Sequence, residues 1–306
     1  MLKYRVLATL RFFDLQETPL TLWEVGRFLL DDPEVMSGRL DKNFELINSA
    51  ERKKATASVP LGDVLECLNT QCGGEVENTL GYYHLPGRSD IARRRWSNYF
   101  YGSKREKRAK TFLPFLKHMP FVRGVAIGGS QALGQQKESS DIDLFIVSEP
   151  GFMWLVRTLI SLYFQLFGMR RHGQKISNRF CLNHYVAGYK QVDRERNLYK
   201  AMEYSRLRPA VYAQGIREFL KANEYWIRAF LPNATFDGKS FESPSIFQRA
   251  GEFLLKNFFG RSLDKTLGFF QRLKIRQDEF TFVLKDELSF HPHSQHRLLL
   301  SKFFSR

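Results

Sequence analysis

The chain has few cysteines and no long apolar run. Three cysteines, Cys67, Cys72 and Cys181, are too few and too unevenly placed for a disulfide framework, which predicts a reducing compartment. The most apolar stretch, residues 152–167, is shorter than the roughly 20 apolar residues that cross a bilayer and is interrupted by an arginine and a glutamine. No basic and apolar leader opens the chain. We therefore expect a cytoplasmic protein with no membrane partner, in which residues 152–167 form a buried helix.

Glycine and proline are also scarce. With 21 Gly and 11 Pro in 306 residues, the chain is neither collagen-like nor of low complexity. A hydrophobic fraction of 43%, with 28 Phe, excludes a mainly disordered chain. The length suggests about two globular domains, at the usual roughly 100 to 200 residues each.

Positive charge is concentrated in part of the chain. The formal net charge of +15 raises the question of a nucleic-acid partner. Residues 1–87, however, hold 9 Lys and Arg against 13 Asp and Glu, whereas residues 88–117 hold 10 against 2. The basic character therefore begins at residue 88, and the first 87 residues are acidic.

The sequence of residues 1–87 indicates three helices followed by a hairpin. Helical spacing of apolar residues predicts helices over residues 2–15 and 61–69, and a capping box at Thr21 and Glu24 predicts another through Leu30. Two short strands, 75–78 and 80–85, are expected around a turn. This layout resembles a winged helix-turn-helix module.

In modules of that layout the third helix commonly binds DNA. Here the third helix carries Asp63 and Glu66 but no Lys or Arg. An acidic module also lacks the cationic surface that supplies most nonspecific DNA affinity. A scaffold or protein-interaction role is favoured, and a winged-helix DNA-binding regulator is the disfavoured alternative.

Three further segments follow the module. Residues 88–117 are predicted to be a basic helical connector, whose interspersed aromatic residues leave a nucleic-acid or phosphate-binding role open. Residues 118–190 contain the apolar strands of a core domain, and residues 191–306 are predicted to be a C-terminal helical domain. A break at Arg208-Pro209 separates two of its expected helices.

The residues that carry chemistry lie in the core domain. An apolar strand, residues 122–127, leads into Gly128-Gly129-Ser130 and then a predicted helix. Glycines at such a turn allow close approach of the backbone to an anion, and the first N–H groups of a helix attract negative charge. The Ser130 hydroxyl adds a donor. This arrangement suits a triphosphate.

A second strand carries two carboxylates, Asp141 and Asp143. Residues two apart on a strand share a face, so the two carboxylates lie together while Ile142 and Leu144 point into the core. Two adjacent carboxylates repel each other unless a cation lies between them. Mg²⁺ is the expected cation, because it takes hard oxygen ligands and completes its octahedron with water and phosphate.

Together these motifs resemble the nucleotidyltransferase superfamily that includes DNA polymerase beta. Its signature is an apolar strand, Gly-Gly or Gly-Ser, about ten residues, and then Asp-x-Asp between apolar residues. The resemblance implies an α+β fold with a mixed-sheet core, flanked here by the winged-helix-like module and the helical domain. It also implies transfer of a nucleoside monophosphate from a nucleoside triphosphate, with Asp141 and Asp143 as catalytic ligands of Mg²⁺ or Mn²⁺ and with Gly128, Gly129 and Ser130 as nucleotide-binding residues.

The third strand departs from the family pattern. The family usually supplies a third carboxylate there, but residues 179–186 contain no acid, and Asn183 takes its expected place beside His184. Either His184 or a distant acid such as Glu195 or Glu203 substitutes, or the acceptor is already deprotonated, or the protein is a nucleotide-binding regulator with weak or no transfer. Arg179, next to this strand, is a candidate nucleotide-binding residue. The acceptor stays open among RNA, a small molecule and a protein.

Overall fold

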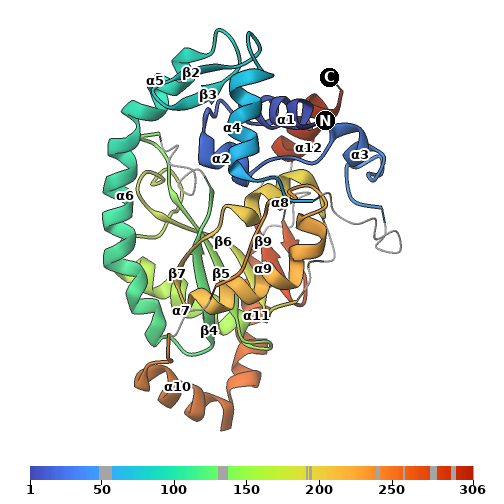
Figure 1. Cartoon of the computed structure of the whole chain (residues 1–306). Coiled ribbons are helices and arrows are strands. Elements are labelled where there is room, and N and C mark those ends of the chain that lie inside the picture. The colour runs from blue at the N-terminus through green and yellow to red at the C-terminus, as the bar shows by residue number, and fades with distance from the viewer. Residues whose placement is uncertain are drawn as a thin grey trace.

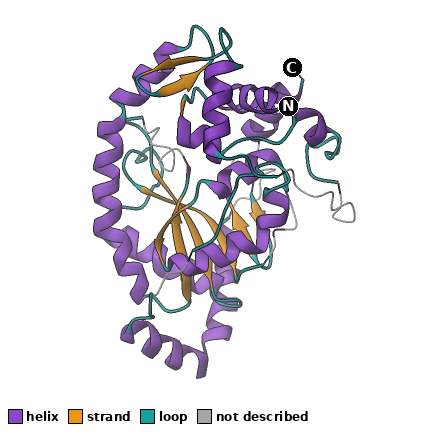
Figure 2. Cartoon of the chain, viewed as in Figure 1, coloured by secondary structure: helices purple, strands orange, loops and turns teal. Residues whose placement is uncertain are grey.

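The fold consists of two sheets with their helices, placed one above the other (Figure 1). The computed structural model describes residues 1–47, 57–129, 137–190, 192, 195–238, 242–257, 259–275, 281–290 and 294–305. The smaller unit holds the start of the chain, and the larger sheet lies below it. Helix α6 runs along one side of the large sheet, and α10 lies at the end farthest from the small unit (Figures 1 and 2).

The small unit is built from the first 84 residues. Its elements are α1 (Leu2–Asp14), β1 (Leu20–Thr21), α2 (Leu22–Arg27), α3 (Pro33–Ser37), α4 (Leu61–Thr70), β2 (Glu77–Thr79) and β3 (Tyr82–His84), and its antiparallel strands run in the order β1-β3-β2. The predicted capping box is present: the Glu24 N–H donates to Thr21 Oγ1 at 3.3 Å and the Thr21 N–H donates to Glu24 Oε2 at 2.9 Å. Helix α2 nevertheless ends at Arg27, before the predicted Leu30.

Helix α4 shows which side of the small unit faces solvent. Val64, Cys67 and Leu68 are buried, whereas Asp63 and Glu66 are exposed. An acidic exposed face on this helix repels the DNA backbone. The winged-helix assignment itself stays a prediction.

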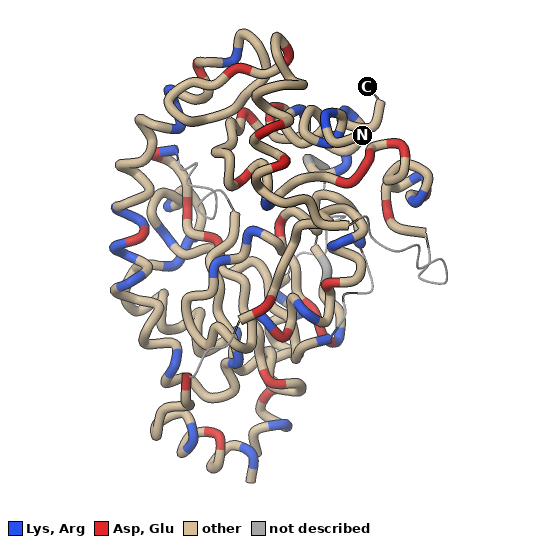
Figure 3. Tube along the Cα trace, viewed as in Figure 1, with Lys and Arg blue, Asp and Glu red and all other residues tan. Residues whose placement is uncertain are grey.

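The basic connector forms helices α5 (Ser89–Ser97) and α6 (Tyr99–Phe112), followed by the short 3₁₀ helix η1 (Leu113–His118). Arg95 of α5 forms an almost fully buried ion pair with Glu24 of α2, at 2.5 Å. This pair fixes α5 to the small unit, and Figure 3 shows Lys and Arg residues along α6 below it.

The large sheet is mixed, as predicted for an α+β core. Its strands are β4 (Val122–Ile127), β5 (Ile142–Ser148), β6 (Phe180–Ala187), β7 (Arg208–Val211), β8 (Phe282–Val283) and β9 (Glu287–Ser289), in the order β7-β4-β5-β6-β9-β8. Strands β5 and β6 are parallel and all other neighbours are antiparallel.

The prediction of a helical domain over residues 191–306 needs correction. Strands β7, β8 and β9 come from this segment and form both edges of the large sheet. The expected helix break at Pro209 is in fact within β7, where a proline is tolerated because the strand lies at the sheet edge. The sheet therefore crosses the boundary predicted at residue 190.

Alternate residues of β5 supply two separate cores. Ile142, Leu144 and Ile146 join the core on the face covered by α7 (Met153–Leu166). Phe145 and Val147 join the core that contains buried residues of α8 (Leu198–Ser205), α9 (Ala213–Ile227) and the small unit. The strand is thus buried on both faces, and residues at its amino end are held in fixed directions.

Three helices complete the C-terminal segment: α10 (Ile246–Asn257), α11 (Gly260–Lys274) and α12 (Ser294–Phe304). Helix α11 packs over α7, where Asp264 Oδ1 accepts from the Leu155 N–H at 2.8 Å. Helix α7 forms where a helix was predicted in residues 152–167 and is buried along half of its residues, but Leu162 and Leu166 are exposed. Among the described residues, no helix has the length and apolar character needed to cross a membrane.

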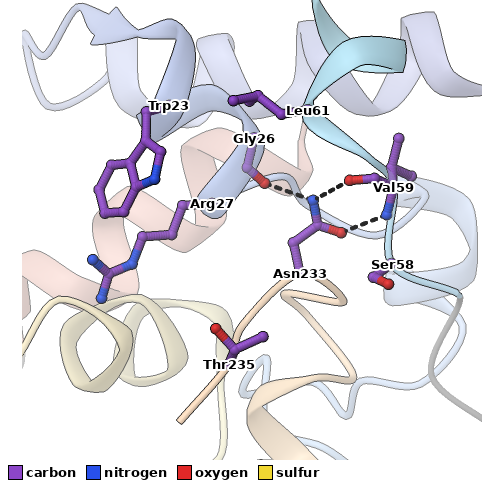
Figure 4. Close-up of a pocket in the computed structure, with 8 residues that line it drawn as sticks. All are labelled: Trp23, Gly26, Arg27, Ser58, Val59, Leu61, Asn233 and Thr235. Atoms are coloured by element: carbon purple, nitrogen blue, oxygen red, sulfur yellow. Dashed lines mark hydrogen bonds between the residues drawn. The ribbon is translucent and has the colours of Figure 1, made fainter. Parts of the chain in front are cut away.

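The small unit is held to the rest of the chain by direct hydrogen bonds. The Asn233 Nδ2 group donates to the carbonyls of Gly26 (2.7 Å) and Val59 (2.9 Å), and Asn233 Oδ1 accepts from the Val59 N–H (Figure 4). A cavity of about 450 Å³ lies at this junction, and Trp23 and Arg27 of α2 are among its lining residues. Arg27 also donates to the carbonyl of Ser205 at 2.7 Å, which ties α2 to α8.

Candidate functional site

The glycine turn lies directly against Asp143. The Gly128 N–H donates to the Asp143 carbonyl at 3.0 Å. Gly129 has a φ of +61°, and a Cβ added there would lie 2.0 Å from Asp143 Oδ2. Only glycine fits both this backbone conformation and this contact. The structure thus brings Gly128, Gly129 and Asp143 together, whereas Ser130 lies outside the described residues.

Asp141 and Asp143 converge as the strand alternation predicted. Each offers a carboxylate oxygen to a group of potential ligand atoms that lie within 4.8 Å of one another. Burial, followed by the charges of Asp141 and Glu203, raises the pKa of Asp143 to about 7, although a hydrogen bond from Asn183 lowers it. Two carboxylates held together in this way carry excess negative charge, which a divalent cation would neutralise.

Asn183 supports Asp143 from the neighbouring strand. Its Nδ2 group donates to Asp143 Oδ1 at 3.0 Å. The amide therefore lies at the site, as predicted, but acts on it as a hydrogen-bond donor to a carboxylate.

His184 is directed elsewhere. Its Nε2 lies 3.1 Å from Glu287 Oε1 of β9, and its ring packs against Phe145 with the centroids 4.7 Å apart. Burial would raise the pKa of Glu287, but the hydrogen bond and charge of His184 lower it below its ordinary value. His184 is thus paired with Glu287 and not with Asp141 or Asp143. This pairing disfavours His184 as the substitute for the missing carboxylate.

Glu203 is the distant acid that comes closest to filling the gap. It lies on α8, its side chain is 18% exposed, and its charge raises the pKa of Asp143. Lys200, on the same helix and fully buried, forms an ion pair with Glu203 at 2.9 Å. This pair holds the Glu203 carboxylate in place, outside the group of ligand atoms formed by Asp141, Asp143 and Cys181.

Cys181 is the site residue that sequence reasoning missed. Strands β5 and β6 pair in parallel with Asp143 opposite Cys181, and the register then shifts before Phe145 pairs with His184. The Cys181 Sγ is the third member of the group of ligand atoms within 4.8 Å. Its spacing of two residues from Asn183 could have indicated a shared face, but only the register places it beside Asp143.

Arg171 lies at the site, whereas no such contact of the predicted Arg179 side chain is found in the part of the chain that the structure describes. The Arg171 Nη1 group donates to Asp141 Oδ2 at 2.6 Å and lies 3.4 Å from Cys181 Sγ. Arg179 contributes its carbonyl, which accepts from the Ile142 N–H at 2.8 Å. No side-chain ion pair of Arg179 is found among the described residues, and its role with nucleotide stays a prediction.

Two arginines of the basic connector hold the loops around the site. Arg105 is fully buried and donates to the carbonyls of Lys137 (2.6 Å), Glu138 (2.8 Å) and Ser140 (3.0 Å), directly before Asp141. Arg108 donates to the carbonyl of Asn178 at 2.6 Å, just before β6. Part of the positive charge of α6 therefore supports the backbone that carries the site.

Comparison with known proteins identifies the domain that contains this site. Residues 107–203 match the nucleotidyltransferase domain family. The match covers about a third of the chain and includes Gly128, Gly129, Asp141 and Asp143, which confirms the resemblance drawn from those residues. No curated protein and no solved structure matches the chain.

Proposed function

Since residues 107–203 form a nucleotidyltransferase domain, we propose that the protein transfers a nucleoside monophosphate from a nucleoside triphosphate to an acceptor, with release of pyrophosphate. The observation that carries this proposal is the contact of the Gly128-Gly129 turn with Asp143. Glycines let a phosphate approach the backbone closely, and this turn lies against a carboxylate that suits the counterion of a phosphate.

Asp141 and Asp143 are the residues that would hold a divalent metal ion, Mg²⁺ or Mn²⁺. Nucleotidyltransferase domains typically use such a metal. The two carboxylates lie close together, and the residue against Asp143 is Gly129, which has no side chain to fill the space, so the site fits a metal ion. When bound, the ion would supply charge neutralisation and Lewis acidity at the reacting phosphate.

The other residues have separate roles in this proposal. The Asn183 amide orients the Asp143 carboxylate, and Arg171 adds positive charge beside Asp141, where the triphosphate would approach. The acceptor hydroxyl forms the new bond to the α-phosphorus, the bond to pyrophosphate breaks, and the acceptor proton passes to a base. We propose Glu203 as this base, because its charge acts on Asp143 and its carboxylate is held by Lys200.

A second candidate function follows from Asn183. A neutral amide in place of the third carboxylate is a poor base, so the domain would bind nucleotide as a regulator without efficient transfer. This alternative differs from the first only in turnover, because both need nucleotide to bind at the same residues.

One experiment tests both candidates. The protein is incubated with each labelled nucleoside triphosphate and Mg²⁺ or Mn²⁺, and released pyrophosphate and labelled acceptor are measured over RNA, small-molecule and protein acceptors. We expect Asp141→Asn and Asp143→Asn to abolish transfer, and Asp237→Asn, on an exposed carboxylate whose side chain is 84% accessible, to retain it. Binding without turnover over the whole acceptor panel favours the regulator. Absence of nucleotide binding, with metal affinity unchanged in the two Asn variants of the site, contradicts both.

A further inference from the structure

The metal site contains a sulfur atom beside its two carboxylates. The ligand atoms of Asp141, Asp143 and Cys181 all lie within 4.8 Å of one another, so small side-chain movements would bring them around one ion. We propose that Cys181 binds the divalent metal as a thiolate, so that the site is a mixed oxygen and sulfur site that favours borderline ions such as Zn²⁺ and Co²⁺ over Mg²⁺. This inference rests on the proposed function, because it concerns the same metal.

The position of Cys181 follows from the sheet. Asp143 and Cys181 are register partners on adjacent parallel strands, and the shift beyond them brings Asn183 onto Asp143 as well. The Asn183 Nδ2 group donates to Asp143 Oδ1 at 3.0 Å, so this amide supports one of the two carboxylates. On this strand, sulfur takes the place that an oxygen ligand would otherwise hold.

A cationic group already lies across two of the three ligands. The Arg171 Nη1 group is 2.6 Å from Asp141 Oδ2 and 3.4 Å from Cys181 Sγ. The same guanidinium nitrogen thus contacts both the Cys181 sulfur and the Asp141 carboxylate, so one cation can interact with both side chains. The Arg171 side chain is 42% exposed, so it has room to withdraw toward solvent when a metal ion binds.

The chemistry of the ligands sets the preference among metals. Thiolate is a soft ligand that suits Zn²⁺, whereas Mg²⁺ takes oxygen and strict octahedral geometry. Binding converts the Cys181 thiol to a thiolate, with its proton released to solvent and the sulfur electron pair donated to the metal. No oxidant or reductant is involved.

Cobalt provides a direct test, because a thiolate bound to Co²⁺ gives a near-ultraviolet charge-transfer band. Metal-free protein is titrated with Co²⁺ as wild type, as Cys181→Ser and as a Cys67→Ala/Cys72→Ala variant. The last variant is needed because Cys67 and Cys72 are free thiols with sulfur atoms 3.9 Å apart. We expect the band in the wild type and the double variant and not in Cys181→Ser.

The affinities give a second readout that does not depend on turnover. In Cys181→Ser the Kd for Co²⁺ rises by at least about 10-fold, because loss of even an outer-shell partner of a bound metal typically lowers its affinity by about 10- to 100-fold. Cys181→Asp restores a third ligand without sulfur, so it binds Mg²⁺ more tightly than the wild type and shows no band. Circular dichroism spectra of Cys181→Ser and Cys181→Asp, compared with the wild type, check that both variants fold.

The outcomes separate this inference from the proposed function. If the band or the wild-type Co²⁺ affinity survives in Cys181→Ser, the proposal that Cys181 is a metal ligand is wrong. It is also wrong if the wild-type protein transfers nucleotide with Mg²⁺ but shows no band with Co²⁺. In that second case the proposed function stands. Failure of the wild type to bind any metal or nucleotide overturns both.

Discussion

The contact between the glycine turn and Asp143 makes a sharp prediction for Gly129→Ala. Two costs apply: the left-handed φ of +61° and the overlap of the new Cβ with Asp143 Oδ2 at 2.0 Å and Cγ at 2.9 Å. The backbone conformation costs an alanine about 1–2 kcal/mol. Overpacking typically adds about 1–3 kcal/mol, because a backbone-anchored carboxylate must shift. We expect a total loss of about 2–5 kcal/mol in the free energy of unfolding.

Gly168→Ala is a matched control for this substitution. Gly168 has a φ of +63°, but nothing lies within 4 Å of a Cβ added there. It therefore carries the backbone cost alone, about 1–2 kcal/mol. The difference between the two variants, measured by urea unfolding, isolates the overlap with Asp143.

Binding distinguishes the two variants a second time. Because the overlap displaces a metal-holding carboxylate, Gly129→Ala should also lose affinity for Mn²⁺ and for nucleotide, whereas Gly168→Ala should keep both. If Gly129→Ala is no less stable than Gly168→Ala and binds Mn²⁺ as the wild type does, the turn does not constrain Asp143 and the reasoning is refuted.

Three further predictions concern the surroundings of the site. Arg105→Ala leaves three loop carbonyls without their donor and should cost about 1–3 kcal/mol in urea unfolding and weaken Mn²⁺ binding, whereas Lys107→Ala, on the exposed face of the same helix, should change stability by less than about 0.5 kcal/mol. The pKa of Asp143 is raised from 3.8 to about 7, so between these pH values the metal-free folded protein holds a proton that the unfolded chain has released. The free energy of unfolding should therefore fall as the pH rises from about 4 to about 7. The affinity for Mn²⁺ should rise over the same range, because the metal binds the deprotonated carboxylate. Thermal unfolding and Mn²⁺ titrations against pH check this, and a flat profile in the wild type, or an equally steep one in Asp143→Asn, would contradict it. Glu203→Gln removes a like charge and should move the midpoint of both profiles to lower pH; an unmoved midpoint would show that Glu203 does not act on Asp143.

The site was predictable where its signal is local. The Gly128-Gly129 turn follows an apolar strand, and Asp141 and Asp143 alternate with core residues, so a few neighbouring residues define both features. The same holds for the capping box at Thr21 and for the buried helix α7. In each case the pattern and the structure depend on contacts a few residues apart.

The missed features depend on pairing between distant segments. Cys181 joins the aspartates only because β5 and β6 are parallel with a shifted register, and no residue near Cys181 specifies that register. Strands β7 and β9 are four and three residues long, and their strand character comes from pairing with β4 and β6. Arg105 and Arg108 lie in the predicted basic connector, but nothing in a run of basic residues reveals which of them meet carbonyls of a distant loop.

The contact between the first and last helices bears on how the chain reaches its native state. Phe12 of α1 packs edge-on against Phe303 of α12, with the ring centroids 5.3 Å apart, and β9 joins β6 across about a hundred intervening residues. Contacts this distant in sequence require large loops to close before they stabilise anything, which slows folding. During synthesis, Phe12 of α1 and the edge of β6 therefore lack their partners in α12 and β9 until those elements have been made. Transiently exposed apolar surface and unpaired strand edges favour aggregation, so this contact pattern makes the partly folded chain prone to aggregate.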